Sequence, residues 1–204
     1  QIKNGLKMIS QIPNLISIFR TALTIWLSIV VLNDPHNVKV LYLGFFLTWV
    51  IIILDGVDGI IARKLNITSD FGAFFDIACD RVTELIFLAL FSTLHWIPFW
   101  VLVIFLVRAV IVDGIRGLAS KEGKTAFGEK SMMESKLGLF LTSSRFMRFT
   151  YGGVKLLAFA FMFISQMKVF SFLQGPEMFL IYLATFLCVV RGVPVIIEGR
   201  RFFS

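Results

Sequence analysis

The sequence has few charged residues and few cysteines for its length. Only 16% of its 204 residues are charged, against about a quarter in ordinary soluble domains. This shortage excludes a disordered chain and a globule that a charged surface keeps in solution. The two cysteines, Cys79 and Cys188, cannot make a disulfide scaffold. Each lies in an apolar run, where we expect a reduced and packed thiol.

Apolar residues take the place of the missing charges. They make up 57% of the chain, and phenylalanine alone occupies 23 positions. This composition indicates an all-α integral membrane protein, and the length suits one membrane domain over residues 1–204. The formal net charge is +7. We attribute it to basic loops that face an anionic membrane leaflet, and we expect no nucleic-acid partner.

Six apolar stretches are long enough to cross a bilayer, which takes about 20 residues in a helix. They are residues 15–32, 40–62, 71–93, 97–118, 137–167 and 179–197. Ten lysines and arginines fall in the loops of one side and two, Lys39 and Lys168, on the other. This bias predicts cytoplasmic termini, as in a bacterial inner membrane. Residues 2–11 have the spacing of a short interfacial helix, with a frayed tail as the alternative.

Four aspartates recur at helical spacing inside the second and third stretches. Asp55 and Asp58 share one helix face at i and i+3, and Asp76 and Asp80 share another at i and i+4. The short connection over residues 64–70 makes the two helices antiparallel neighbours. We therefore expect the four carboxylates to converge in one pocket at the cytoplasmic side.

Four buried carboxylates repel one another unless a cation lies among them. Apart from Arg63, no basic residue alternates with them on these two helix faces. Hard oxygen ligands suit Mg²⁺ or Mn²⁺, and two such ions could clamp a phosphoryl group. Gly59, Ala62 and Gly72 leave room on the same faces for a large ligand, or they serve close helix packing.

The pattern D-x2-D-G-x2-A-R-x8-G-x3-D-x3-D runs from Asp55 to Asp80 without a substitution. It resembles the signature of the CDP-alcohol phosphotransferases, and the six-span plan with cytoplasmic termini is similar to that family as well. The resemblance implies an enzyme of phospholipid biosynthesis. Such an enzyme transfers the phosphatidyl group of CDP-diacylglycerol to a small alcohol and releases CMP.

The resemblance also implies roles for individual residues. Asp55, Asp58 and Asp76 would bind two Mg²⁺ or Mn²⁺ ions. Asp80 would lie beside these ions as a further ligand and as the general base. The CDP and pyrophosphate site would comprise Asp58, Gly59, Ala62, Arg63, Gly72 and Asp76. Family members are commonly homodimers, which we expect here too.

Basic residues in the fourth and fifth stretches could bind a phosphorylated acceptor, because guanidinium groups bind phosphate in a bidentate manner. The candidates are Arg108, Arg116, Lys136, Arg145 and Arg148. The alternative is that some of them pair with Asp113 and Glu134 or bind lipid headgroups. We expect Glu84 and Arg191 to be residues that either pair within the protein or extend their charged ends toward the membrane surface.

Two local resemblances point to different acceptors. Residues 12–20, which include Asn14 and Arg20, resemble the opening of phosphatidylglycerophosphate synthases. They favour glycerol 3-phosphate as the first-choice acceptor. Residues 71–76 and the pair Asp80-Arg81 resemble the inositol-using members instead. Inositol or inositol phosphate is therefore the second choice.

Charged residues in membrane spans also occur in ion-coupled transporters, which form the alternative class. A transporter favours helices broken near the bilayer midplane and internal repeats. The sequence shows no repeat, and its acids lie toward the cytoplasmic ends of the predicted spans. We therefore place the transferase first.

Overall fold

The computed structural model describes residues 12–64, 70–124 and 131–203, without the side chains of residues 12–13, 55–64, 70, 71, 73 and 203. The predicted interfacial helix at residues 2–11 lies outside these ranges. The elements are helices: α2 (Ile12–Asn33), α3 (Val38–Lys64), α4 (Asp70–Thr93), α5 (Phe99–Lys121), α6 (Lys136–Gly138), η1 (Leu139–Ser143), α7 (Arg145–Ser165), η2 (Lys168–Leu173), α8 (Gln174–Gly199) and η3 (Arg200–Phe203). The all-α prediction is confirmed.

Several of these helices have the length and composition of membrane spans. Among the described residues, three helical segments are long and apolar enough to cross a bilayer: Asn14–Asn33, Arg145–Ser165 and Lys168–Phe202. Large apolar side chains are exposed to an extent that water does not favour, with Phe149 at 83% and Phe46 at 63%. The chain is therefore an integral membrane protein. The count of six spans stays a prediction.

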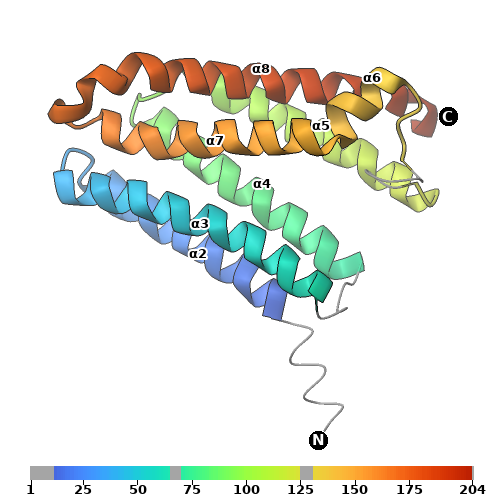
Figure 1. Ribbon diagram of the computed structural model, residues 1–204, viewed down its shortest axis with the longest axis horizontal. Coiled ribbons are helices and arrows are strands. Elements are labelled where there is room, and N and C mark those ends of the chain that lie inside the picture. The colour runs from blue at the N-terminus through green and yellow to red at the C-terminus, as the bar shows by residue number, and fades with distance from the viewer. Residues whose placement is uncertain (1–11, 65–69, 125–130, 204) are drawn as a thin grey trace, which may run out of the picture. The chain divides into compact units, whose positions relative to one another are not determined.

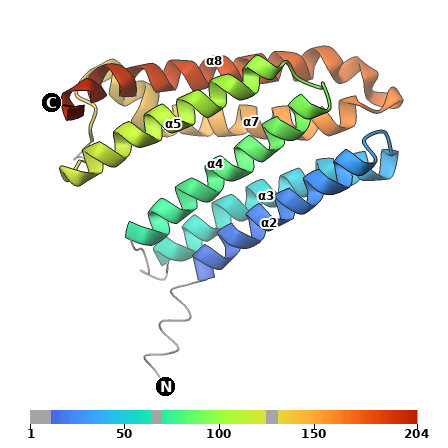
Figure 2. The ribbon, with the colours of Figure 1, turned by 180° about the vertical axis from the view of Figure 1, so that it is seen from behind.

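The helices form two compact units. Unit 1 contains α2, α3, α4 and the segment Phe159–Leu173. In it, α2 and α3 lie side by side in opposite directions (Figure 1). The connecting turn is closed by Asn37, whose side chain donates to Asp34 at 2.8 Å and accepts from the Lys39 amide at 3.0 Å. As Figure 2 also shows, α2 begins at the end of this unit where α3 ends and α4 begins.

A cluster of aromatic rings lies in the core of unit 1. The ring of Phe91 lies 5.3 Å from that of Phe163 and 5.9 Å from those of Phe87 and Trp96, measured between centroids. Gly44 on α3 gives this cluster its space, because a Cβ atom there would collide with the ring of Phe163. The packing ties α3 and α4 to the end of α7.

Unit 2 contains α5, α6, η1, residues 145–158 of α7, α8 and η3. α5 and α8 run in the same direction and α7 runs against them (Figure 1). Trp100 stacks on Tyr182 at 5.7 Å, and farther along the pair Ile115 packs against Gly199. One hydrophobic cluster in the core of this unit comprises Val112, Ile115, Ala119, Met132, Met133, Val195 and Phe202.

The prediction of one continuous helix over residues 137–167 is wrong. The helix has a π-helical segment at Leu139–Ser143 and stops at Ser144, whose backbone is extended with φ −64° and ψ 142°. The hydroxyl of Ser144 accepts a hydrogen bond from the amide of Met147 at 3.1 Å. Serine is favoured at a helix N-cap because its oxygen satisfies such an amide. A new helix, α7, therefore starts at Arg145.

Two other helices extend beyond the spans predicted for them. α5 continues to Lys121 beyond the stretch predicted to end at 118, and α8 begins at Gln174 rather than at 179. These extra turns carry polar residues such as Ser120 and Glu177. Hydropathy marks the apolar part of a helix, whereas backbone hydrogen bonding continues past it.

Candidate active site

Asp76 and Asp80 lie one turn apart on α4 and turn toward the same cation. The guanidinium of Arg20 on α2 donates from Nη2 to Asp80 Oδ1 at 2.5 Å, and the same nitrogen lies 3.6 Å from Asp76 Oδ1. Ser17, one turn before Arg20, donates its hydroxyl to Asp76 Oδ1 at 3.2 Å. Ser17 and Arg20 share one face of α2 because they are three residues apart. This face lies against the face of α4 that carries both aspartates.

This geometry adds a basic group from a third helix to the aspartates of α4, whereas the expectation for Arg63 stays a prediction. Arg20 is only 2% exposed, and it lies in an apolar helix where a charge without a partner is costly. Two carboxylates on a neighbouring helix compensate it. The sequence offered Arg20 as a candidate, but the contact joins residues 60 positions apart. Ser17 was missed, although its i−3 position before Arg20 was an available signal.

The other half of the predicted carboxylate group lies on α3. Asp55, Asp58, Gly59, Ala62 and Arg63 fall in the last turns of that helix, and their side chains lie outside the described part of the chain. The convergence of all four carboxylates therefore stays a prediction. Two further candidates are placed: Gly72, in the first turn of α4, and Asn14, in the first turn of α2, are both half-buried.

The described side chains contain no group of three or more metal-binding residues. The two described aspartates fit a cation nonetheless, because their carboxylates already turn toward one, the guanidinium of Arg20. They also offer the oxygen donors that Mg²⁺ and Mn²⁺ prefer. The part of the site that is described thus agrees with the predicted ligand type, and metal binding itself stays a prediction.

Comparison with known proteins identifies the family. Residues 10–190 match the model of the CDP-alcohol phosphatidyltransferase family, which covers most of the chain and both units. The chain belongs to this family. The match includes the aspartates of α3 and α4 together with Ser17 and Arg20 of α2.

Three relatives bear the same name, CDP-diacylglycerol–glycerol-3-phosphate 3-phosphatidyltransferase. The protein from Wigglesworthia glossinidia brevipalpis is 35% identical over 115 residues, which are 51% of this chain and 61% of the relative. The Mycoplasma genitalium protein is 38% identical over 79 residues, 37% of this chain and 32% of the relative. The Bacillus subtilis protein is 31% identical over 70 residues, 34% of this chain and 36% of the relative. The chain thus matches less than two thirds of the length of each.

The predicted acceptor residues of this family member all belong to unit 2. Arg116 forms an ion pair with Asp113 on the same helix, with 3.7 Å between Nη1 and Oδ1. Arg108 is buried at 8% exposure and packs its side chain against Gly192 of α8. Lys136, Arg145 and Arg148 are exposed. A phosphate site formed by these five residues stays a prediction.

Of the two alternatives for Glu84 and Arg191, the structure shows pairing within the protein. Arg81 donates to Glu84 at 2.9 Å. Arg191 of α8 donates to the carbonyl oxygen of Met147 at 2.9 Å and to that of Thr142 at 3.4 Å. These two carbonyls lie on either side of the break at Ser144. Arg191 therefore bridges the two helical segments that the break separates.

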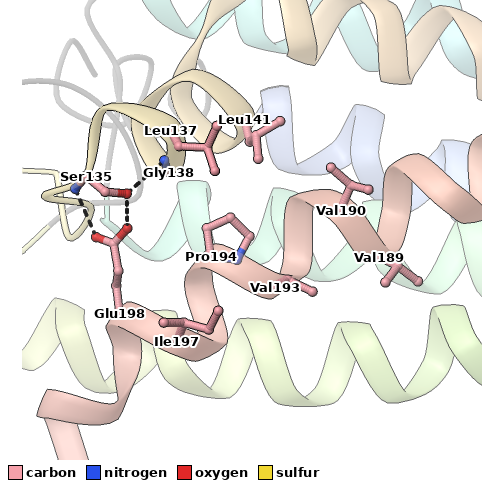
Figure 3. Close-up of a pocket in the computed structure, with 10 residues that line it drawn as sticks. All are labelled: Ser135, Leu137, Gly138, Leu141, Val189, Val190, Val193, Pro194, Ile197 and Glu198. Atoms are coloured by element: carbon pink, nitrogen blue, oxygen red, sulfur yellow. Dashed lines mark hydrogen bonds between the residues drawn. The ribbon is translucent and has the colours of Figure 1, made fainter.

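A cavity of about 340 Å³ lies between α6, η1 and α8. Its lining is mainly aliphatic, with Leu137, Leu141, Val190 and Val193 among its residues (Figure 3). At one end the Glu198 carboxylate accepts from the hydroxyl of Ser135 at 2.5 Å and from the Glu134 amide at 2.6 Å. Of the predicted acceptor residues, none lines this cavity.

The segment before α6 is held by a second contact with the C-terminal helix η3. Arg201 forms an ion pair with Glu134 and donates to the carbonyl oxygen of Met132 at 2.5 Å. Glu134, which the pairing alternative assigned to one of the predicted acceptor residues, therefore has Arg201 as its partner. The start of α6, which carries Lys136, is fixed to the end of the chain.

Proposed function

We propose that this chain transfers the phosphatidyl group of CDP-diacylglycerol to the hydroxyl of a small alcohol and releases CMP. Glycerol 3-phosphate is the proposed acceptor, and phosphatidylglycerophosphate is the product. The observation that carries the proposal is the contact of Asp76 and Asp80 on α4 with Arg20 of α2. Both aspartates belong to the complete aspartate signature. The names of the three relatives support the choice of acceptor.

In the proposed reaction, the acceptor hydroxyl oxygen attacks the phosphorus that carries the diacylglycerol. The bond between this phosphorus and the CMP oxygen breaks, and CMP leaves with the electron pair. Asp80 takes the proton of the acceptor hydroxyl. Transfer of this kind depends mainly on positioning and on neutralisation of charge. Arg63 would supply positive charge beside the diphosphate.

Asp55, Asp58, Asp76 and Asp80 are the proposed ligands of two Mg²⁺ or Mn²⁺ ions. Bound there, the ions would neutralise charge on the diphosphate and favour departure of CMP. Arg20 and Ser17 hold Asp76 and Asp80 in place from α2. The protein thus keeps the carboxylates ordered beside the place where the diphosphate would bind.

The membrane placement is part of the proposal. We propose six spans with both termini and the aspartates at the cytoplasmic side, where a soluble acceptor can meet a lipid donor. The bias of lysine and arginine in alternate loops supports this orientation. We also propose a homodimer, and cross-linking of the purified protein in detergent tests it.

A direct assay tests the function. Purified protein with Mg²⁺ or Mn²⁺ and CDP-diacylglycerol is offered glycerol 3-phosphate, inositol or inositol phosphate, and CMP release is measured. We expect release with glycerol 3-phosphate. Release with an inositol compound alone would transfer the proposal to that acceptor, which Arg81 after Asp80 favours.

Transport is the second candidate, because the helix break at Ser144 is a feature that transporters also show. Reconstituted vesicles distinguish the two classes. Ion flux across the vesicle membrane, with no CMP release for any acceptor, would contradict the transferase proposal.

A further inference from the structure

Arg20 is far more buried than the two aspartates it contacts. Its side chain is 3% exposed, whereas those of Asp76 and Asp80 are 40% and 39% exposed. One nitrogen, Nη2, lies within 3.6 Å of Oδ1 of both carboxylates. The guanidinium is thus on the buried side of the carboxylates, which keep about two fifths of their surface exposed.

This arrangement puts a permanent charge next to the proposed metal ligands. An arginine in a protein stays protonated at every physiological pH. A divalent cation that binds Asp76 and Asp80 must therefore share their negative charge with Arg20. Two positive charges a few ångströms apart near a protein surface repel one another more strongly than in bulk water.

We infer that Arg20 is a fixed counter-ion that holds Asp76 and Asp80 in place and weakens their affinity for a divalent cation. The inference rests on the proposed function, because it concerns the metal ligands of that function. Its consequence is that cations bind firmly only when the diphosphate of a substrate adds negative charge. Arg20 is in this sense a positioning residue that couples ion binding to substrate binding.

Ser17 separates the two parts of this role. It donates to the same oxygen of Asp76 that Arg20 approaches, yet it carries no charge. Removal of its hydroxyl loosens the carboxylate without changing the local charge. Removal of the Arg20 charge changes the local potential. The two substitutions should therefore shift cation affinity in opposite directions.

The test measures Mn²⁺ binding by electron paramagnetic resonance on the purified protein, with Mn²⁺ alone and no nucleotide or lipid substrate added. We expect Arg20→Gln to bind Mn²⁺ about tenfold more tightly than the wild type, from the loss of charge repulsion. Ser17→Ala should bind it slightly more weakly. Arg20→Lys keeps the charge on a shorter side chain, so its affinity should lie between those of the wild type and Arg20→Gln.

Lys39→Gln is the matched control. It removes the same charge from unit 1 at the start of α3, about 28 Å along the helix from Asp58 at 1.5 Å per residue. We expect wild-type Mn²⁺ affinity. Equal tightening in Lys39→Gln and Arg20→Gln would show an effect of net charge and overturn the inference.

Unchanged or weaker Mn²⁺ binding in Arg20→Gln also overturns it. If Arg20→Gln does not remain monodisperse, Arg20→Lys decides, and weaker binding than in the wild type overturns the inference. Absence of Mn²⁺ binding in every variant overturns it as well. CMP release by the same wild-type preparation then shows separately whether the proposed transfer reaction stands.

Discussion

Arg20 in unit 1 and Arg191 in unit 2 are both buried and are compensated in different ways. Arg20 in unit 1 is 2% exposed and contacts two half-buried carboxylates on another helix. Arg191 in unit 2 is 7% exposed, donates to two backbone carbonyls and lies 4.9 Å from the ring centroid of Tyr151. Carboxylates that contact a guanidinium can also bind a metal cation from solution. The backbone carbonyls at the helix break, by contrast, have lost their partners in the helix and need a permanent hydrogen-bond donor. Under the proposed function, Arg20 therefore contacts residues of the reaction, whereas Arg191 stabilises the break between two helical segments.

The largest expected effect is on the rate of CMP release, through one of the carboxylates that contact Arg20. Asp80→Asn keeps the size of the side chain but removes the proposed base. CMP release should fall about 10²–10⁴-fold, the usual contribution of a general base. The rate of CMP release at saturating substrate measures it. Asp34→Asn, in the exposed turn between α2 and α3, is the control and should stay active. Full activity of Asp80→Asn would break the assignment of this pair to chemistry.

Arg191→Leu should lower stability and leave ion binding intact. The change leaves the carbonyls of Thr142 and Met147 without the guanidinium and removes its contact with Tyr151. The expected loss is about 2–4 kcal/mol in the free energy of unfolding. Unfolding in mixed detergent micelles measures it, and Mn²⁺ affinity should not change. A wild-type unfolding free energy, or a shift in Mn²⁺ affinity like that of Arg20→Gln, would contradict the distinction between the two arginines.

Alanine substitution of one glycine in each unit should change the free energy of unfolding by smaller amounts and in opposite directions. Gly44→Ala in unit 1 places a Cβ atom against the ring of Phe163, so we expect a loss of about 1–3 kcal/mol. Gly153→Ala in unit 2 meets no atom within 4 Å in the described part of the chain. It should be neutral or stabilise α7 by about 0.5–1 kcal/mol. Both are measured as unfolding free energies. Equal effects of the two changes would show that the ring of Phe163 can move aside for a Cβ atom at little cost in stability.

Ser144→Ala has the smallest expected effect. It removes the hydroxyl that accepts from the Met147 amide at the start of α7. Loss of an N-cap costs about 1 kcal/mol. Ser144→Gly should cost less, because glycine also suits this position. If Ser144→Ala unfolds at the wild-type denaturant concentration, then the N-cap hydroxyl contributes little to the stability of the break, which Arg191 also bridges.

Much of the fold follows from local pattern. The apolar stretches predicted most helices to within a few residues, because hydropathy and helical hydrogen bonding coincide inside a membrane. The break at Ser144 was missed. The apolar run continues on both sides of it, so hydropathy gives no sign of a stop. The hydroxyls of Thr142, Ser143 and Ser144 were the available signal, since serine and threonine favour helix caps.

Pairings between helices were harder to predict than the helices themselves. The sequence offered Arg116 both as a phosphate ligand and as a partner of Asp113, and its i and i+3 spacing allowed the pair that the structure shows. It gave no comparable guide to the contact between Arg201 and Glu134, which lie 67 positions apart. Local spacing predicts contacts on one helix, whereas contacts between helices depend on how the helices pack.

The order of the residues alone determined the helices, the membrane environment and the placing of two aspartates on one face of α4, since each depends on hydropathy or a period of 3.6 residues. Only the tertiary structure brought Arg20 and Ser17 to those aspartates and Arg191 to the break before α7. These contacts join distant parts of the chain. They form because a charged group or an unsatisfied carbonyl in an apolar helix is costly unless a group on a neighbouring helix pairs with it.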